Sequence, residues 1–203
     1  MSRQRNDLRR LLAQEAARII ALEGVRDFLA AKRKAAARLG VRNQSHTVPT
    51  NVEIEAALVE YQRLFHADTQ GARLRTLREA AHRAMRLFER FEPRLVGSVL
   101  NGTATVHASV ELHLFVDGAE QVALHLMQRE IPFETVERRL KRVAGDYLTC
   151  PAYRFLAGDV TIEAVVFPYD AIREAPASAV DGRPMRRATI RDLEALLSEE
   201  SGW

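Results

Sequence analysis

The sequence is poor in cysteine and in long apolar runs, and each shortage removes a class of protein. Cys150 is its single cysteine, which excludes an internal disulfide framework and a cysteine-rich zinc site. No run of about 18 or more apolar residues occurs, so we expect no membrane-spanning helix and no membrane partner. The first ten residues, MSRQRNDLRR, lack the apolar core of a secretion signal. A cytoplasmic location is therefore expected.

Positive charge is concentrated at the N-terminal end. Residues 1–42 hold 11 Lys or Arg against 4 Asp or Glu, whereas the remainder holds 19 against 23. A basic arm of this kind attracts phosphates or an acidic partner, and it is equally the pattern of a solvated helix face. Phe28 is its only aromatic residue, so the arm does not have the composition of a base-stacking platform.

The first half of the chain shows a helical period. Apolar residues recur with that period over residues 7–38, with Gly24 as a break or bend. Thr50 and Glu53 have the spacing of a capping box, which predicts the start of a second helical stretch. A further helix is expected over residues 72–91.

The second half changes to the alternation that is typical of strands. The predicted strands cover residues 94–98, 109–117, 133–138, 152–157 and 160–167. Gly158–Asp159 joins the last two as a hairpin turn. Residues 119–130 are expected to form a helix with Met127 among its inward side chains, and a final helix is expected to start at Thr189.

This order of elements predicts an α+β fold in two parts. Residues 1–92 form a helical module. Residues 93–203 form a second domain, a small mixed sheet with flanking helices.

A Gly-Ser turn precedes the most regular of the predicted strands. Gly97 and Ser98 close a short apolar run, and Gly102 and Thr103 complete the pattern Gly-Ser-x-x-x-Gly-Thr. The hydrophilic face of the following strand is predicted to carry Ser109, Glu111, His113, Phe115 and Asp117. This layout resembles the nucleotidyltransferase fold of the DNA polymerase β type. In that family a Gly-Ser turn precedes a strand whose Asp-x-Asp pair holds magnesium.

The resemblance covers residues 93–167 and implies a set of site residues. Its phosphate-binding residues are Gly97, Ser98, Gly102 and Thr103. Two registers are open for the acidic pair: Ser109 with Glu111, which the spacing favours, and Glu111 with His113, which offers better ligands. Glu163 takes the place of the third carboxylate. The resemblance thus makes Glu111, His113 and Glu163 the candidate catalytic and metal-binding residues.

Both aspartates of the family pattern are missing, which predicts altered or lost catalysis. Magnesium prefers hard oxygen ligands, and Ser109 offers an oxygen without charge. Histidine suits zinc better than magnesium. A divalent cation (Mg, Mn or Zn) is therefore the candidate cofactor, and we expect none to be bound.

The resemblance implies a nucleotidyltransferase-like protein that binds a nucleotide, RNA or a protein partner, with a second copy of this chain among the candidates. Whether it is an enzyme stays open. The alternative is a non-enzymatic interaction module that uses the basic N-terminal helices.

Two weaker patterns complete the sequence evidence. Arg75 and His82 lie seven residues apart and weakly resemble the Arg-x6-His motif of the HEPN ribonucleases. A basic cluster follows the third predicted strand and consists of Arg138, Arg139, Lys141 and Arg142. We expect this cluster on a solvated helix face, and a nucleotide- or RNA-facing role is the alternative.

Overall fold

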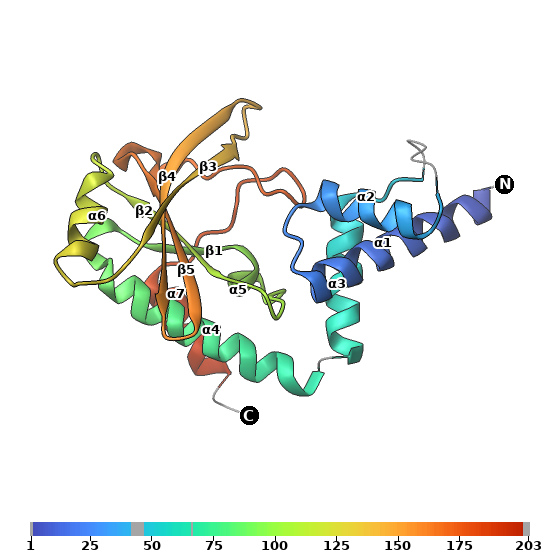
Figure 1. Ribbon diagram of the computed structural model, residues 1–203, viewed down its shortest axis with the longest axis horizontal. Coiled ribbons are helices and arrows are strands. Elements are labelled where there is room, and N and C mark those ends of the chain that lie inside the picture. The colour runs from blue at the N-terminus through green and yellow to red at the C-terminus, as the bar shows by residue number, and fades with distance from the viewer. Residues whose placement is uncertain (1, 42–46, 66, 201–203) are drawn as a thin grey trace. The chain divides into compact units, whose positions relative to one another are not determined.

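The computed structural model describes residues 2–41, 47–65 and 67–200, and it has an α+β fold with an N-terminal helical region (Figure 1). Within these residues the chain divides into two compact units. The first comprises residues up to 71 with the short segments 103–108 and 179–181, and the second comprises the rest. The predicted boundary at residue 92 differs from this division, because most of helix α4 (Ala67–Leu87) belongs to the second unit.

The first unit is built on α1 (Ser2–Glu23), α2 (Phe28–Arg38) and α3 (Asn51–Phe65). Alanines dominate its buried face, and small side chains let helices pack closely around Ile19 and Ile54. Gly24 separates α1 from α2 in the left-handed conformation (φ +67°), as the predicted break requires.

The predicted capping box at the start of α3 is confirmed. The amide of Glu53 donates to Thr50 Oγ1 at 3.2 Å, and the amide of Thr50 donates to Glu53 Oε2 at 2.6 Å. Farther along α3, the buried Gln62 donates from Nε2 to the carbonyl oxygens of Thr103 and Ala104, both at 3.1 Å. These bonds fix segment 103–108 to the helices of the first unit.

The second unit holds a five-stranded mixed sheet of order β1-β2-β5-β4-β3. Its strands are β1 (Arg94–Val96), β2 (Val110–Phe115), β3 (Glu134–Lys141), β4 (Tyr147–Ala157) and β5 (Val160–Phe167). β2 and β5 pair in parallel, and the other neighbours are antiparallel. The hairpin predicted at Gly158–Asp159 is confirmed, since Ala157 pairs with Val160.

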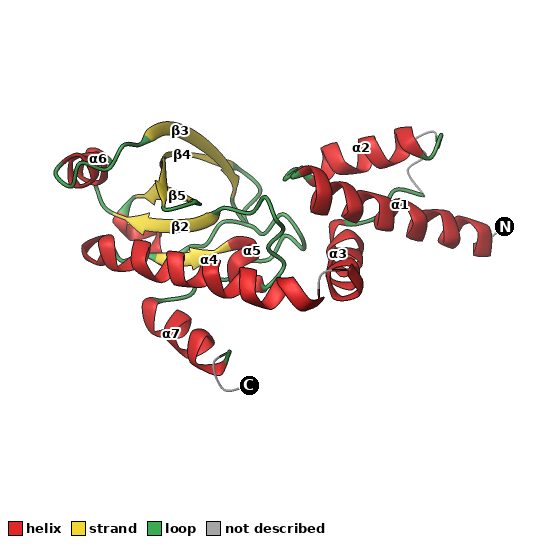
Figure 2. Ribbon diagram, turned by 60° about the horizontal axis from the view of Figure 1, so that its bottom comes forward, coloured by secondary structure: helices red, strands yellow, loops and turns green. Residues whose placement is uncertain are grey.

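Helices cover the first face of the sheet, which carries Leu112 and Leu114 of β2 and Phe155 of β4. Figure 2 shows α4 running along the sheet. The Phe88 ring, just beyond α4, meets Phe155 edge to face with centroids 5.7 Å apart. α6 (Glu120–Met127) contributes buried Val122 and Leu126. The prediction that Met127 points inward was wrong: its side chain is 62% exposed, because Met127 is the last residue of α6.

The second face of the sheet carries Glu111 and His113 of β2 and Glu163 of β5. At one end of this face Phe115, Phe167 and Cys150 belong to an apolar cluster that also includes Ile172 of the 3₁₀ helix η2 (Tyr169–Arg173). The apolar environment raises the pKa of the Cys150 thiol to about 11.

Four short or terminal elements complete the second unit. They are the 3₁₀ helix η1 (Glu89–Phe91), helix α5 (Gly97–Asn101), η2 and helix α7 (Ile190–Glu199). α7 begins directly after Thr189, in agreement with the predicted start, and Thr189 forms a capping box with Asp192. Just before it, Ala188 pairs with Leu95 of β1 in an antiparallel bridge.

The basic cluster predicted on a helix face lies on a strand. Arg138, Arg139 and Lys141 belong to β3, and Arg142 follows it. The prediction was wrong because β3 extends beyond the predicted strand, which ended at residue 138. Side chains of residues 134–141 point alternately to the two faces of the sheet, and the pairing with β4 extends to Lys141↔Tyr147.

Candidate functional site

The Gly-Ser turn opens directly beside the side chain of Glu111. Gly97 starts α5 in the left-handed conformation (φ +74°). A β-carbon on Gly97 would stand 3.1 Å from Oε2 of Glu111. Only glycine combines this backbone angle with so close an approach. The turn and the half-buried carboxylate of Glu111 therefore form one local structure.

Five residues stand in register across the whole sheet, and we call them the cross-sheet row. They are Val96 of β1, Glu111 of β2, Glu163 of β5, Arg154 of β4 and Glu134 of β3. Residues in register point to the same side, and neighbouring strands lie about 4.8 Å apart. Glu163 is therefore the immediate neighbour of Glu111, which is the arrangement expected from the sequence.

Glu163 has arginine partners on both of its oxygens. Arg138 Nε lies 2.8 Å from Oε1 in an ion pair that lacks hydrogen-bond alignment, and Arg154 donates to Oε2 from Nη2 at 3.0 Å and from Nε at 3.3 Å. The Glu163 side chain is 0% exposed. A buried carboxylate needs such partners, because desolvation strongly disfavours an isolated charge. The hydrogen bond from Arg154 to Glu163 in turn raises the pKa of the Arg154 guanidinium.

His113 lies on the same face, two residues along β2 from Glu111, and it is enclosed. Arg187 Nε donates to His113 Nδ1 at 3.1 Å, and the His113 ring lies 4.6 Å from that of Phe167. Burial, with the nearby Arg187 charge, lowers the pKa of His113 to about 3. The imidazole is thus neutral at physiological pH, and Nδ1 is already taken by a donor.

The remaining predicted phosphate-binding residues separate from one another. Ser98 follows Gly97 in the first turn of α5, whereas Gly102 caps the other end of that helix with an N–H bond to Ser98 O. Thr103 belongs to the first unit, where its carbonyl accepts from Gln62. Ser109 is buried beside the start of β2, and its Oγ has no hydrogen-bond partner among the described residues. The structure brings Gly97, Ser98, Glu111 and Glu163 into one region and leaves Gly102 and Thr103 outside it.

The Arg75–His82 pair is engaged elsewhere. Arg75 Nε donates to Glu79, and His82 Nε2 lies 2.9 Å from Oε1 of Glu194 on α7. The first contact lies within α4, and the second joins α4 to α7. They offer no sign of the ribonuclease arrangement that the motif suggested.

No sequence pattern singled out Arg154 or Arg187. The pairing of Arg154 with Glu163 could have been predicted, because a two-residue turn at Gly158–Asp159 sets the register of the hairpin. Arg187 carried no local signal, since it lies in an irregular segment and reaches His113 through the tertiary fold.

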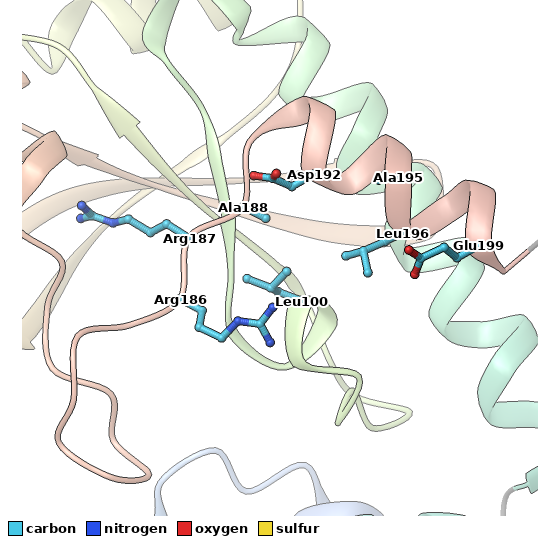
Figure 3. A pocket seen from close by; sticks show the side chains of 8 residues that line it. All are labelled: Leu100, Arg186, Arg187, Ala188, Asp192, Ala195, Leu196 and Glu199. Carbon is cyan, nitrogen blue, oxygen red and sulfur yellow. The ribbon is translucent and has the colours of Figure 1, made fainter.

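A separate cavity of about 250 Å³ lies between α5 and α7. Leu100, Leu196, Arg186 and Glu199 are among its lining residues (Figure 3). The Arg187 side chain points away from the other labelled side chains. None of the lining residues of the cavity belongs to the cross-sheet row.

Three observations bound the functional assignment. Within residues 2–41, 47–65 and 67–200, no group of three or more His, Cys, Asp and Glu side chains is arranged to hold a metal ion. No helix among those residues has the length and apolar character needed to cross a membrane. Comparison with known proteins found no matching family model, no matching curated protein and no matching solved structure.

Proposed function

We propose that the second unit is a nucleotidyltransferase-like domain that has lost nucleotidyl transfer and binds a nucleotide on the second face of its sheet. The resemblance of the Gly97–Ser98 turn and the following strand suggests the ligand class. The single observation that carries the proposal is the pairing of Glu163, beside Glu111, with two arginines.

The loss of transfer follows from the donor set of this region. A two-metal site needs several carboxylate oxygens that are free to bridge the ions. Here both oxygens of Glu163 face guanidinium groups, and the position two residues from Glu111 holds either Ser109 or the neutral His113.

The experiment combines a turnover assay with calorimetry. Each of ATP, GTP, CTP and UTP is incubated with the protein and Mg²⁺ or Mn²⁺, and pyrophosphate release and labelling of protein or RNA are followed. Calorimetry then measures binding to the wild type and to Glu111→Gln. Glu137→Gln is the matched control, because Glu137 is exposed on β3 on the opposite face of the sheet.

We expect binding of at least one nucleotide, no pyrophosphate release, and an effect of Glu111→Gln that Glu137→Gln does not share. With Mg²⁺ present, the sign of that effect is informative. If Glu111 holds no metal, as proposed, removing its charge beside the phosphates improves affinity. Pyrophosphate release that disappears in Glu111→Gln, with weaker binding, would show an active metalloenzyme and reject the proposed loss.

The interaction-module alternative has less support, because several basic side chains of the arm are already in ion pairs. Arg9, Arg18, Lys34 and Arg38 of the basic arm are already paired with Glu53, Glu15 and Glu23. Arg10, Arg26 and Arg33 are exposed and have no ion-pair partner within the described part of the first unit. These three side chains are therefore the first candidates for a binding role of the arm. Absence of nucleotide binding by a folded protein would favour this alternative.

A further inference from the structure

We propose that Arg138 and Arg154 form a phosphate-binding pair that recognises the polyphosphate of a nucleotide without a divalent metal. This inference rests on the proposed nucleotide binding and specifies how that binding is achieved. In it, two guanidinium groups anchored on Glu163 provide the positive charge that metal ions bring to phosphates in two-metal sites.

Glu163 forms ion pairs with both arginines and orients Arg154 through two hydrogen bonds. Glu163 is 0% exposed, and each of its oxygens has one guanidinium within 3.0 Å. Arg138 comes from β3 and Arg154 from β4, so two strands deliver them to one carboxylate. A planar guanidinium held from one edge presents its other N–H groups in a fixed direction, which reduces the entropy lost on binding.

The outer edges of both groups reach solvent. The side chains of Arg138 and Arg154 are 36% and 37% exposed. Arg138 Nη1 and Nη2 have no hydrogen-bond partner among the described residues. Arg154 Nη1 lies 3.2 Å from Glu134 Oε2, and the Glu134 side chain is 64% exposed. Exposed ion pairs of this kind are weak, so an incoming anion can displace Glu134 at little cost.

The charge of the group favours an anion once Glu134 is displaced. Arg138 and Arg154 face two carboxylates, the buried Glu163 and the exposed Glu134, so displacement of Glu134 by a phosphate leaves one positive charge beside the phosphate. Arginine binds phosphate oxygens through two parallel N–H groups, which makes phosphate a better match than a halide or a single carbonyl.

The length of the cross-sheet row also suits the polyphosphate of a nucleotide. Arg154 lies two strands from Glu111, which corresponds to about 10 Å at the usual strand spacing. A polyphosphate chain extended along the row therefore passes from Arg138 and Arg154 toward the Gly97 turn. The sugar and base would then lie beyond one end of the row.

Calorimetry of ATP in EDTA tests the proposal directly. The variants are Arg138→Met and Arg154→Met, with Arg138→Lys and Arg154→Lys as charge-retaining versions in case the methionine variants fold poorly. Arg139→Met is the matched control. Arg139 is the next residue of β3, points to the opposite face, and lies 4.1 Å over the Tyr147 ring. Circular dichroism verifies the fold of each variant.

We expect the wild type to bind ATP in EDTA. Each methionine variant should weaken binding at least about tenfold, because a hydrogen bond to a charged group is lost. The lysine variants should bind ATP with affinities between those of the methionine variants and the wild type. The affinity of Arg139→Met should stay within about twofold of that of the wild type.

Three results would overturn the inference, and they differ in what else they reject. If binding requires Mg²⁺ and has the same affinity in the Arg138 and Arg154 variants as in the wild type, the arginine pair is rejected. The proposed nucleotide binding then still stands. An equal loss in Arg139→Met shows non-specific attraction to a basic strand. No binding of any nucleotide by the folded wild type, with or without metal, rejects both proposals together.

Discussion

Arg187 donates from Nε to Nδ1 of His113 at 3.1 Å, and this contact joins the segment before α7 to the second strand of the sheet. The same guanidinium donates from Nη1 to the carbonyl oxygens of Ala171 and Ile172 and lies 4.8 Å over the Phe115 ring. Burial lowers the pKa of Arg187 to about 10. A cation is thus enclosed together with a neutral imidazole that accepts from it.

This environment predicts a pH dependence of stability. The pKa of His113 is about 3 in the folded protein and about 6.5 when unfolded, so the unfolded chain takes up the proton first as pH falls. The contribution of His113 is complete above about pH 6.5 and declines by up to about 1.4 kcal/mol per pH unit between 6.5 and 3. Urea denaturation at several pH values between 4 and 7 measures this slope.

The comparison variant for this prediction is His113→Gln, which cannot be protonated there. Its free energy of unfolding should be lower at pH 7 and should change less steeply with pH than that of the wild type. The carboxylates of the chain also titrate in this range, and the difference between the two slopes isolates His113. Parallel slopes would contradict the enclosed, neutral imidazole.

A second prediction concerns Gly97. Gly97→Ala places a β-carbon 3.1 Å from Glu111 Oε2 at a residue with φ +74°. We expect destabilisation by about 1–3 kcal/mol, from the left-handed backbone and from displacement of Glu111. Gly158→Ala is the control, because Gly158 has φ +64° and open space around its Cα. Chemical denaturation should show a larger loss for Gly97→Ala.

A double variant separates the contact with Glu111 from the backbone strain at Gly97. Gly97→Ala combined with Glu111→Ala removes the close contact and leaves only the backbone strain. The second substitution should therefore harm the Gly97→Ala protein less than it harms the wild type. Strictly additive effects would show that the turn and the carboxylate do not interact.

The sequence predicted the sheet neighbourhood of this site because the relevant signals are local. A two-residue turn at Gly158–Asp159 and clean alternation in residues 109–117 identify β5 and β2. The resemblance to the nucleotidyltransferase fold then implied a position for Glu163 near Glu111. Register within one hairpin is set by its turn, and the side-chain direction follows from the period of two.

The sequence could not predict which residues compensate the buried negative charge of Glu163. Arg138 was assigned to a helix face, because a run of basic residues has no period of its own and the end of β3 is defined by pairing with β4. Arg187 is 74 positions from His113, and nothing in the residues around either one indicates the contact. Partners of buried charges are selected by the tertiary fold, which local patterns do not encode.

A third prediction separates the basic arm from the sheet. The variant Arg10→Gln/Arg26→Gln/Arg33→Gln removes three exposed charges of the first unit while keeping its buried core. We expect its nucleotide affinity to equal that of the wild type. Its affinity for single-stranded RNA should show a salt dependence within about one unit of slope of the wild type, since few phosphates are contacted. A reduction of the slope by about two units would support the interaction-module alternative.

The last prediction addresses the stability of the Glu163 ion pairs. In Arg138→Met/Arg154→Met the fully buried Glu163 carboxylate loses both partners. Removing the partners of a buried charge destabilises by about 3–5 kcal/mol, so thermal and urea denaturation should show a severe loss. Either single variant should lose much less, because one guanidinium still neutralises the carboxylate.

The triple variant Arg138→Met/Arg154→Met/Glu163→Leu decides whether these ion pairs exist for stability. If packing alone matters, a leucine in place of the buried carboxylate restores most of the stability that the double variant loses, because apolar side chains can replace a buried ion pair without net loss. We expect that recovery, together with loss of nucleotide binding in EDTA. A stable triple variant without affinity would assign the arginines to ligand recognition, whereas a triple variant as unstable as the double would assign them to the fold.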